Sequence, residues 1–358
     1  MPDRCRFCFV VPPHLLRRVA ETPDHPQAAA AANSLQMSQH LVATRGAAAA
    51  PVAQDGSAVA ALAQSVFTCN NGVSLPGSTV RTTADPPVAD AAVNQAFDNT
   101  ATTWRFYHEV LGRNSIDGNG GPLTSSVHYD MHYMNAMWNG QQMLYGDGDG
   151  QMLRGFTAAL DVIAHELTHG VTNATAGLGH VGMSGALNEH FSDVFASLVK
   201  QWSQGQTAAQ GDWLIGNSVL GPAFQGRALR DMANPGTAYD NPVYHKDPQP
   251  GHMSGYVTLP DNKDRGGAHI NSGIPNRAFV LAAQSIGGNA WEVAGRIWYT
   301  VLTQKLRPDA DFKTCALATL DVAKASGVSA AGMIARAWLT TGVLADGDVA
   351  AAGVQTAA

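Results

Sequence analysis

The apolar positions follow different patterns on the two sides of residue 160. Between about residues 64 and 160 they form short runs. Those at 123–129 and 142–145 lie between turn-forming Gly, Asn and Asp residues, as strands do. A longer stretch over 93–111 is typical of one helix, and helical periodicity dominates from residue 161 onward. It predicts helices over 158–176, 185–203, 275–286, 289–303, 311–325 and 329–341.

The first 60 residues have a different character. Leu15, Leu16 and Val19 fall on one face of a helix-like stretch over 14–21. After residue 46 the chain is rich in alanine without a periodic pattern, which is typical of a linker. We interpret this region as a short prosegment followed by its linker.

The composition excludes several classes of function. The net charge is −6, and only 14% of the residues are charged, with no basic stretch that could neutralise a phosphate track. We therefore expect no nucleic-acid partner. A hydrophobic content of 45% excludes disorder of the whole chain. No stretch approaches the ~18 unbroken apolar residues of a transmembrane helix, so we expect no membrane span.

The N-terminus lacks the pattern of a secretory signal peptide. Such a signal has a cationic start followed by ~7–15 apolar residues. Here Asp3 lies near the start, and Pro12 and Pro13 end a short apolar run at 8–11. We expect synthesis in the cytoplasm, with any secretion by a non-classical route.

Four cysteines in a chain of 358 residues are no disulfide framework. Cys5 and Cys8 form a Cys-x-x-Cys pair, for which two interpretations stay open. They are two small apolar side chains at one end of the chain. Alternatively, they are a redox pair or supply a thiolate that reaches a metal elsewhere.

The segment 161–170 carries the most informative chemistry, because it contains His-Glu-x-x-His. On a helix, His165 and His169 share one face, and their spacing allows both imidazoles to bind one Zn²⁺ ion. Glu166 flanks the ion without having to bind it, and it can take the proton of a water that zinc activates. The motif therefore predicts a zinc site with its own general base.

A third zinc ligand is expected further along the chain. Only five glutamates occur beside 23 aspartates, and two of the five are Glu166 and Glu189. Glu189 can project from a second helix toward the first. Asp193 lies one turn later and can accept a hydrogen bond from the free ring nitrogen of a ligand histidine, while Asn188 can support the same arrangement.

With these segments in place, the chain resembles the thermolysin family of zinc endopeptidases, and in particular its protealysin-like members with short prosegments. The resemblance covers nearly the whole chain and rests on the order and spacing of several strings. Pro-Pro-His-Leu-Leu at 12–16 is similar to the motif of those prosegments. The other matching strings lie at 135–140, 145–150, 161–170, 175–178, 184–189, 229–230 and 266–273.

The resemblance implies a role for each matching residue. His165, His169 and Glu189 would bind zinc, and Glu166 would be the general base. His269 would stabilise the oxyanion of the tetrahedral intermediate. The remaining implied roles are the orientation of His269 by Asp264, a contact of Arg230 with a substrate carbonyl, the alignment of the substrate backbone by Asn135 and Ala136, and an apolar pocket lined by Phe156, Val162, Ile215, Val219 and Leu229.

These roles predict the reaction and its partners. The protein is expected to hydrolyse polypeptides on the N-terminal side of large apolar residues, with zinc as its cofactor. Its own prosegment, residues 1 to about 50, is expected to inhibit it, because tethering supplies a high effective concentration.

The chain departs from the family at a tyrosine that helps to bind the oxyanion. In the family this tyrosine lies fifteen residues after the first zinc histidine, and here His180 stands at that position. A histidine can also donate a hydrogen bond, although its reach and pKa differ. We therefore treat His180 as a candidate oxyanion donor and expect an altered pH profile.

A second departure concerns the double calcium site of the family. Of the matching positions, Asp161 and Asp212 are acidic, but Lys200, Leu214 and Asn217 are not. Calcium needs ~6–8 oxygen ligands with several carboxylates among them. Lys200 could instead pair with Asp161 or Asp212. We expect the double site to be lost, with at most one weak calcium ion remaining.

The predicted fold is α+β and thermolysin-like, with a strand-rich N-terminal lobe, a helical C-terminal lobe and the zinc helix between them. The expected boundaries are 1–50 for the prosegment and linker, 51–180 for the N-terminal lobe with the zinc helix, and 181–358 for the C-terminal lobe.

Two alternatives to an endopeptidase stay open. A zinc aminopeptidase would need an acidic anchor for a free substrate amine, and no such motif lies near the zinc strings. A catalytically silent protein that keeps the fold to bind a partner is favoured only by His180, because Glu166 and all three zinc ligands are present.

Overall fold

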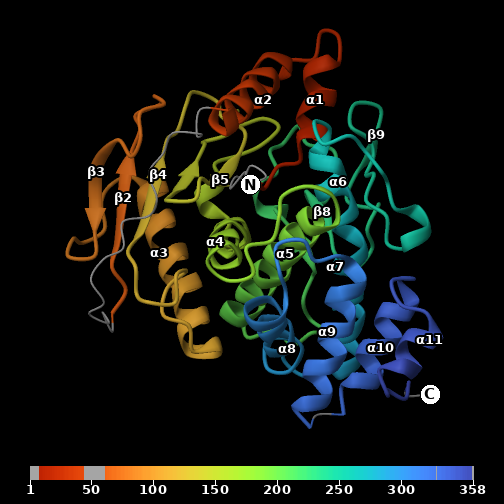
Figure 1. The fold of residues 1–358 in the computed structure, drawn as a ribbon. Helices are drawn as coiled ribbons and strands as arrows, with labels where there is room; N and C mark the ends of the chain where they lie inside the picture. Colours follow the sequence, from red (N-terminus) through yellow and green to blue (C-terminus); the bar gives the residue numbers. More distant parts are fainter. Residues whose placement is uncertain (1–7, 44–60, 328, 357–358) are drawn as a thin grey trace. The chain divides into compact units, whose positions relative to one another are not determined.

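The computed structural model describes residues 8–43, 61–327 and 329–356 (Figure 1). The chain divides into two compact units, each built from more than one segment. Unit 1 comprises Met1–Val171, Gly216–Leu229 and Tyr239–His245, and unit 2 comprises Thr172–Ile215, Arg230–Ala238 and Lys246–Ala358. The prosegment boundary at residue 50 stays a prediction, and so do both interpretations of the pair Cys5 and Cys8. Residue 50 and Cys5 lie outside the described residues, and of Cys8 only the backbone is described.

Unit 1 contains a mixed sheet. The strand order across the sheet is β1 (Cys8–Phe9), β5 (Ala136–Trp138), β6 (Met143–Tyr145), β4 (Leu123–Val127), β2 (Gln64–Thr68) and β3 (Ser78–Thr82). β2, β4 and β6 pair in parallel, and the other neighbours pair antiparallel. β4 and β6 confirm the strands predicted over 123–129 and 142–145.

The prosegment strand β1 lies at one edge of this sheet. Its register on β5 places Cys8 opposite Trp138 and Phe9 opposite Met137. The Phe9 side chain is buried in a cluster with Tyr129, Tyr133 and other apolar residues of unit 1. The prosegment therefore completes part of the core of unit 1.

Two helices of the prosegment follow (Figure 1, red). α1 (Pro13–Glu21) confirms the helix predicted over 14–21, and Leu15, Leu16 and Val19 are buried as its apolar face requires. α2 (Ala28–Ala43) was not predicted, although it begins with a run of alanines, the residue type with the highest helix propensity. The hydroxyl of Ser38 in α2 lies 2.9 Å from that of Tyr133, so polar contacts also hold the prosegment.

The remaining helices of unit 1 begin at well-defined positions. The Asp90 carboxylate accepts hydrogen bonds from the N–H groups of Ala92 and Val93, and so caps α3 (Ala91–Arg105). α3 continues as the π-helical turn η2 (Phe106–Val110), which confirms the long helix predicted over 93–111. α4 (Leu160–Ala174) confirms the helix that carries His-Glu-x-x-His.

Unit 2 is largely helical, as predicted, and the five helices predicted after residue 180 are confirmed. Its core includes the large rings of Trp213, Phe279, Trp298 and Trp338, which contact one another in series. Its helices are α5 (Gly182–Gln204), α6 (Asp264–Asn271), α7 (Gly273–Ile286), α8 (Ala294–Thr300) with the π-helical η6 (Val301–Lys305), α9 (Phe312–Ala325), α10 (Ala331–Thr340) and α11 (Asp346–Ala351).

The chain between α5 and α6 contains short strands. β7 (Leu214–Ile215) pairs with β8 (Arg230–Asp231), and β9 (Asp240–Asn241) pairs with β10 (His245–Lys246). Within the described parts of the chain, no helix has the length and apolar character needed to cross a membrane.

Candidate active site

His165, Glu166 and His169 lie in α4, and all three are buried. All three side chains have no exposed surface. The two histidines are one helical turn apart, and their Nε2 atoms lie 3.1 Å from each other. Two nitrogens that bind one tetrahedral Zn²⁺ ion at about 2.0–2.1 Å would lie roughly 3.3 Å apart. The spacing of the imidazoles therefore suits a shared zinc ion.

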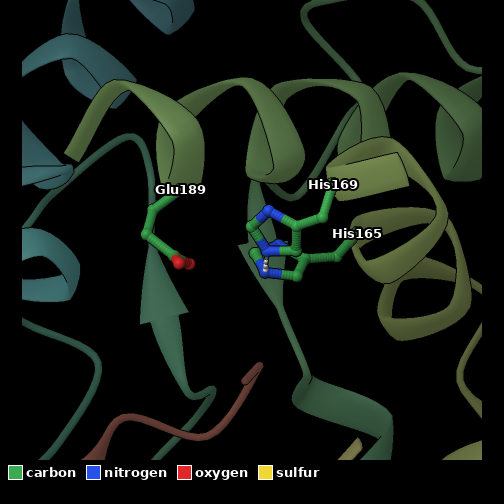
Figure 2. A group of neighbouring side chains, drawn as sticks. All are labelled: His165, His169 and Glu189. Atoms are coloured by element: carbon green, nitrogen blue, oxygen red, sulfur yellow. Dashed lines mark hydrogen bonds between the residues drawn. The ribbon is translucent and has the colours of Figure 1, made fainter. Parts of the chain in front are cut away.

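Glu189 of α5 completes the set. The ligand atoms of His165, His169 and Glu189 all lie within 4.8 Å of one another, and all three residues are buried. Figure 2 shows the histidines on one helix and Glu189 on another, with the rings and the carboxylate directed into the same space. Two imidazoles and one carboxylate are a donor set that zinc accepts in hydrolytic enzymes. We call these three residues the zinc cluster.

Glu166 is held in place by β5, the strand that pairs with the prosegment strand β1. The backbone N–H of Trp138 in β5 donates a hydrogen bond of 2.7 Å to Glu166 Oε2. This bond fixes the orientation of the carboxylate of Glu166, which directly follows the zinc-cluster residue His165 in α4. The sequence motif predicts the role of Glu166, but the contribution of Trp138 comes from a main-chain group and left no sequence signal.

His269 is paired with two carboxylates. Its Nδ1 lies 2.6 Å from Asp264 Oδ1, and its Nε2 lies 3.6 Å from Glu189 Oε1. Burial by itself lowers the pKa of His269, but the charges of Glu189 and Asp264 outweigh it and raise the pKa above its usual value. The Asp264 contact has the geometry that the predicted orienting role needs. The catalytic role of His269 stays a prediction.

The segment that leads to His269 has an unusual backbone. Asp264, Arg265, Gly266 and Gly267 have φ values of 47°, 51°, 71° and 87°. Glycine adopts this left-handed region without cost, whereas a side chain raises the energy there. The bend brings Asp264 back toward the helix, where its second oxygen accepts the N–H of Ile270 at 3.1 Å.

Asp193 and Arg230 form a buried pair. The Arg230 guanidinium donates two hydrogen bonds to Asp193, from Nε at 2.8 Å and from Nη2 at 2.7 Å. Asn276 donates a third, at 2.9 Å, to the same carboxylate. From the sequence, Asp193 is expected to accept a hydrogen bond from a ligand histidine, and Asn276 is not expected at this position. The roles of Asp193 toward a histidine and of Arg230 toward a substrate carbonyl stay predictions.

Asn135, expected to align substrate, is engaged by the prosegment. Its Oδ1 accepts the N–H of Val11 at 3.0 Å, and its Nδ2 donates to the Val11 carbonyl at 3.3 Å. Ala136 begins β5, the strand that pairs with β1. The residues predicted to contact a substrate backbone therefore contact the backbone of the chain's own prosegment.

The residues predicted to line an apolar pocket are buried, and their role in specificity stays a prediction. Each is at most 1% exposed. Leu229 lies against Gly216, where an added Cβ would approach Leu229 Cδ1 to 2.6 Å. The full set is Phe156, Val162, Ile215, Val219 and Leu229.

His180, which stands where the family has a tyrosine, is buried beside Asn188. His180 is 8% exposed, and its Nδ1 lies 3.5 Å from the side-chain nitrogen of Asn188. An amide nitrogen can only donate, so Nδ1 is the acceptor and the proton of the neutral ring is on Nε2. The Nε2–H group of His180 is thus a hydrogen-bond donor, and its contact with an oxyanion stays a prediction.

At the predicted calcium positions the structure contains a lysine contact. Lys200 Nζ lies 2.9 Å from Asp212 Oδ1 and donates to the Leu214 carbonyl at 3.0 Å. Asp212 is one of the two predicted partners of Lys200. Asp161 accepts the N–H groups of Val162 and Gly216 at 3.0 and 2.9 Å.

Comparisons with known proteins agree with this site. The thermolysin metallopeptidase catalytic domain matches residues 51–173, and the alpha-helical domain of the same metallopeptidases matches residues 176–343. An extracellular metalloprotease of Pectobacterium carotovorum subsp. carotovorum is 44% identical over 339 residues, which are 94% of this chain and 96% of that protein. Protease PrtS of Photorhabdus sp. (strain Az29) is 46% identical over 264 residues, covering 74% and 71% of the two chains.

A solved structure is also similar. The precursor of protealysin, a metalloproteinase from Serratia proteamaculans, matches with a TM-score of 0.84 and 43% identity, covering 94% of this chain and 100% of that one. The fold and the site define a zinc metalloendopeptidase with a precursor form. The chain belongs to the thermolysin family, and within it to the protealysin-like members.

Proposed function

We propose that the protein is a zymogen that cleaves polypeptides on the N-terminal side of large apolar residues. The observation that carries this proposal is the buried zinc cluster beside Glu166, whose carboxylate is fixed by the N–H of Trp138. A bound zinc ion would lower the pKa of a water molecule and polarise the substrate carbonyl. The residues of the chain supply the rest of the chemistry.

Glu166 takes the proton from the attacking water and passes it to the leaving amine. His269 donates a hydrogen bond to the oxyanion, and the short contact with Asp264 keeps its ring in one orientation. Arg230 holds a substrate carbonyl, and its two hydrogen bonds to the Asp193 carboxylate keep the guanidinium in one orientation. The buried apolar residues around Leu229 provide the preference for a large apolar side chain.

The prosegment inhibits by occupying the position of a substrate. Extended peptides bind to a free sheet edge through main-chain hydrogen bonds. The antiparallel pairing of β1 with β5, and the two bonds between Val11 and Asn135, use the same groups that would align a substrate. Because the prosegment is tethered, it competes at a high effective concentration without a high intrinsic affinity.

The test is the intact mass of the wild-type chain beside Glu166→Ala, both expressed from Met1. We expect the wild type to lose roughly its first 50 residues and to cleave an added peptide before a large apolar residue. The variant should stay full length and bind the same amount of zinc. Removal of a general base costs about 10²–10⁴ in rate.

An exposed glutamate supplies the control. Glu109→Gln should process itself like the wild type, because its side chain lies on the surface of η2. If Glu166→Ala is trimmed at the wild-type rate in the absence of other proteases, or cleaves the added peptide as fast, the proposed role of Glu166 is wrong.

A further inference from the structure

A second contact holds the prosegment and involves no residue of the zinc cluster. Two side chains of α1 that lie one turn apart reach the segment 239–245 of unit 1. His14 Nε2 lies 2.9 Å from the Tyr239 hydroxyl. Arg18 Nη1 contacts His245 Nδ1. These residues carry no role in the proposed reaction.

The chemistry of the Arg18–His245 contact depends on protonation. A guanidinium has only donors, so His245 Nδ1 must accept, and the ring must be neutral for the contact to exist. Protonation of the ring removes this acceptor and places two cations next to each other. Imidazoles ordinarily gain their proton near pH 6.5, within the physiological range. His245 is exposed, so protons reach it directly.

The surrounding charges do not favour a second cation. The charged and titratable residues of the two contacting segments are His14, Arg17, Arg18 and Glu21 on α1, and Tyr239, Asp240, Tyr244, His245 and Lys246 on the segment 239–246. With both histidines neutral and both tyrosines uncharged, the two segments carry three cations and two carboxylates, and protonation of both histidines adds two further positive charges.

We propose that Arg18 and His245 form an acid-sensitive latch, which holds α1 on unit 1 at neutral pH and loosens it when His245 becomes protonated. The consequence for activity rests on the proposed function, because only an inhibitory prosegment turns this loosening into activation. The loosening itself does not depend on catalysis and can be measured in a variant that cannot cut itself.

The latch acts on top of a contact that does not respond to pH. Leu15, Leu16 and Val19 are at most 1% exposed, and apolar burial does not depend on protonation. Acid therefore weakens the docking of α1 without removing it. The loss of one hydrogen bond and the gain of one exposed repulsion together predict an increase in opening of about tenfold.

The experiment measures hydrogen exchange of the full chain carrying Glu166→Ala, at pH 7.5 and pH 5.5. Rates are converted to protection factors, so that the intrinsic pH dependence of exchange is removed. We expect the amides of α1 to lose about tenfold in protection at pH 5.5. The amides of α3 should keep theirs, which shows that the loss is local.

His245→Asn in the same background is the decisive variant. The backbone of His245 has φ 61°, a conformation that asparagine tolerates, and the amide oxygen still accepts from Arg18 but cannot be protonated in this range. Protection of α1 in this variant should be the same at both pH values. Arg17→Gln, which removes a neighbouring charge, should keep the tenfold change.

Two results would overturn the latch. The first is a protection of α1 that does not change with pH in the Glu166→Ala chain. The second is a change with pH that persists in His245→Asn. If the latch is present but the unsubstituted chain shows no self-processing at either pH, the latch stands and the proposed function fails.

Discussion

Glu166 and His269 are each fixed by a partner at the level of single atoms. The carboxylate of Glu166 accepts a main-chain N–H, and the ring of His269 contacts the carboxylate of Asp264. Such contacts place a reactive group before the substrate arrives, so that less reorganisation is needed during the reaction. The sequence predicts both groups and, through the family resemblance, the contact of Asp264 with His269, whereas the main-chain N–H of Trp138 left no sequence signal.

His128 provides a pH-dependent contribution to stability, distinct from the active site. Its Nδ1 lies 2.7 Å from Asp147 and its Nε2 lies 2.9 Å from Asp90. The bond to Asp147 and then that to Asp90 raise the pKa of His128 to about 9, against the opposing effect of burial. The folded-state pKa therefore exceeds the unfolded value of about 6.5, so the stabilisation is complete below pH 6.5 and is lost as the pH rises through 9.

We expect His128→Asn to lower the free energy of unfolding by about 1–2 kcal/mol at pH 6–7, a value reduced for solvent screening of the exposed aspartates. The difference from the wild type should shrink above pH 9. Urea unfolding at several pH values measures both. His132→Asn is the control, because His132 is exposed and shares the left-handed backbone. A His128→Asn effect that stays constant from pH 6 to 10 would contradict the assignment.

His180 allows a direct test of the departure from the family. If its Nε2–H binds the oxyanion, His180→Ala should lower kcat by about tenfold or more with little change in KM, because the contact forms only in the transition state. His180→Tyr, which restores the family residue, should recover much of the loss. Steady-state kinetics over a range of pH supply the measurement. A pH–rate profile of His180→Ala identical to that of the wild type would remove His180 from the mechanism.

At the scale of elements, the sequence predicts helices with a periodic apolar face and misses others, among them α2 and α6. Periodic apolar faces gave α1, α3, α4 and α5 within a few residues of their observed ends. α2 was missed because its alanine run has high propensity but no amphipathic period. α6 was missed because its first turn is left-handed at four positions, a tertiary bend that no propensity encodes.

The buried apolar face of α1 is expected to control the rate of self-processing. Leu16 is 1% exposed, and truncation of a buried leucine costs about 2–5 kcal/mol. Leu16→Ala should therefore weaken the docked prosegment and speed self-processing at least tenfold, with no change in kcat of the processed enzyme. Intact mass against time gives the rate. Glu21→Ala, at an exposed position of the same helix, should process at the wild-type rate. Equal rates for Leu16→Ala and the wild type would show that α1 does not control processing.

At the scale of the whole molecule, each of the two compact units is built from segments that are separated along the chain. Residues 216–229 and 239–245 lie in the sequence beyond the first part of unit 2, yet they belong to unit 1. A boundary drawn along the sequence cannot express this interleaving, because contacts between distant segments determine it. The same reason explains why the pairing of Val11 with Asn135, across 124 residues, had no sequence signal.

Stability of the whole molecule should not depend on calcium. Lys200 places an ammonium between Asp212 and the Leu214 carbonyl, and this cation supplies the positive charge that neighbouring oxygens would otherwise take from a metal ion. The side chain of Lys200 is 12% exposed, so the contact is largely protected from solvent. We expect the wild type to have the same Tm in excess calcium and in a calcium-selective chelator.

Substitution of Lys200 by glutamate should make the Tm depend on calcium. Lys200→Glu places two carboxylates side by side, which should lower the Tm in the chelator by several degrees, and millimolar calcium should recover part of the loss. Lys305→Glu is the matched control. It breaks a Lys–Asp pair of similar length, with Asp321 at 3.0 Å, that is 43% and 67% exposed and is worth little. A rise of many degrees for the wild type in calcium would mean that a metal site persists beside Lys200, and the ammonium would then be no substitute for it.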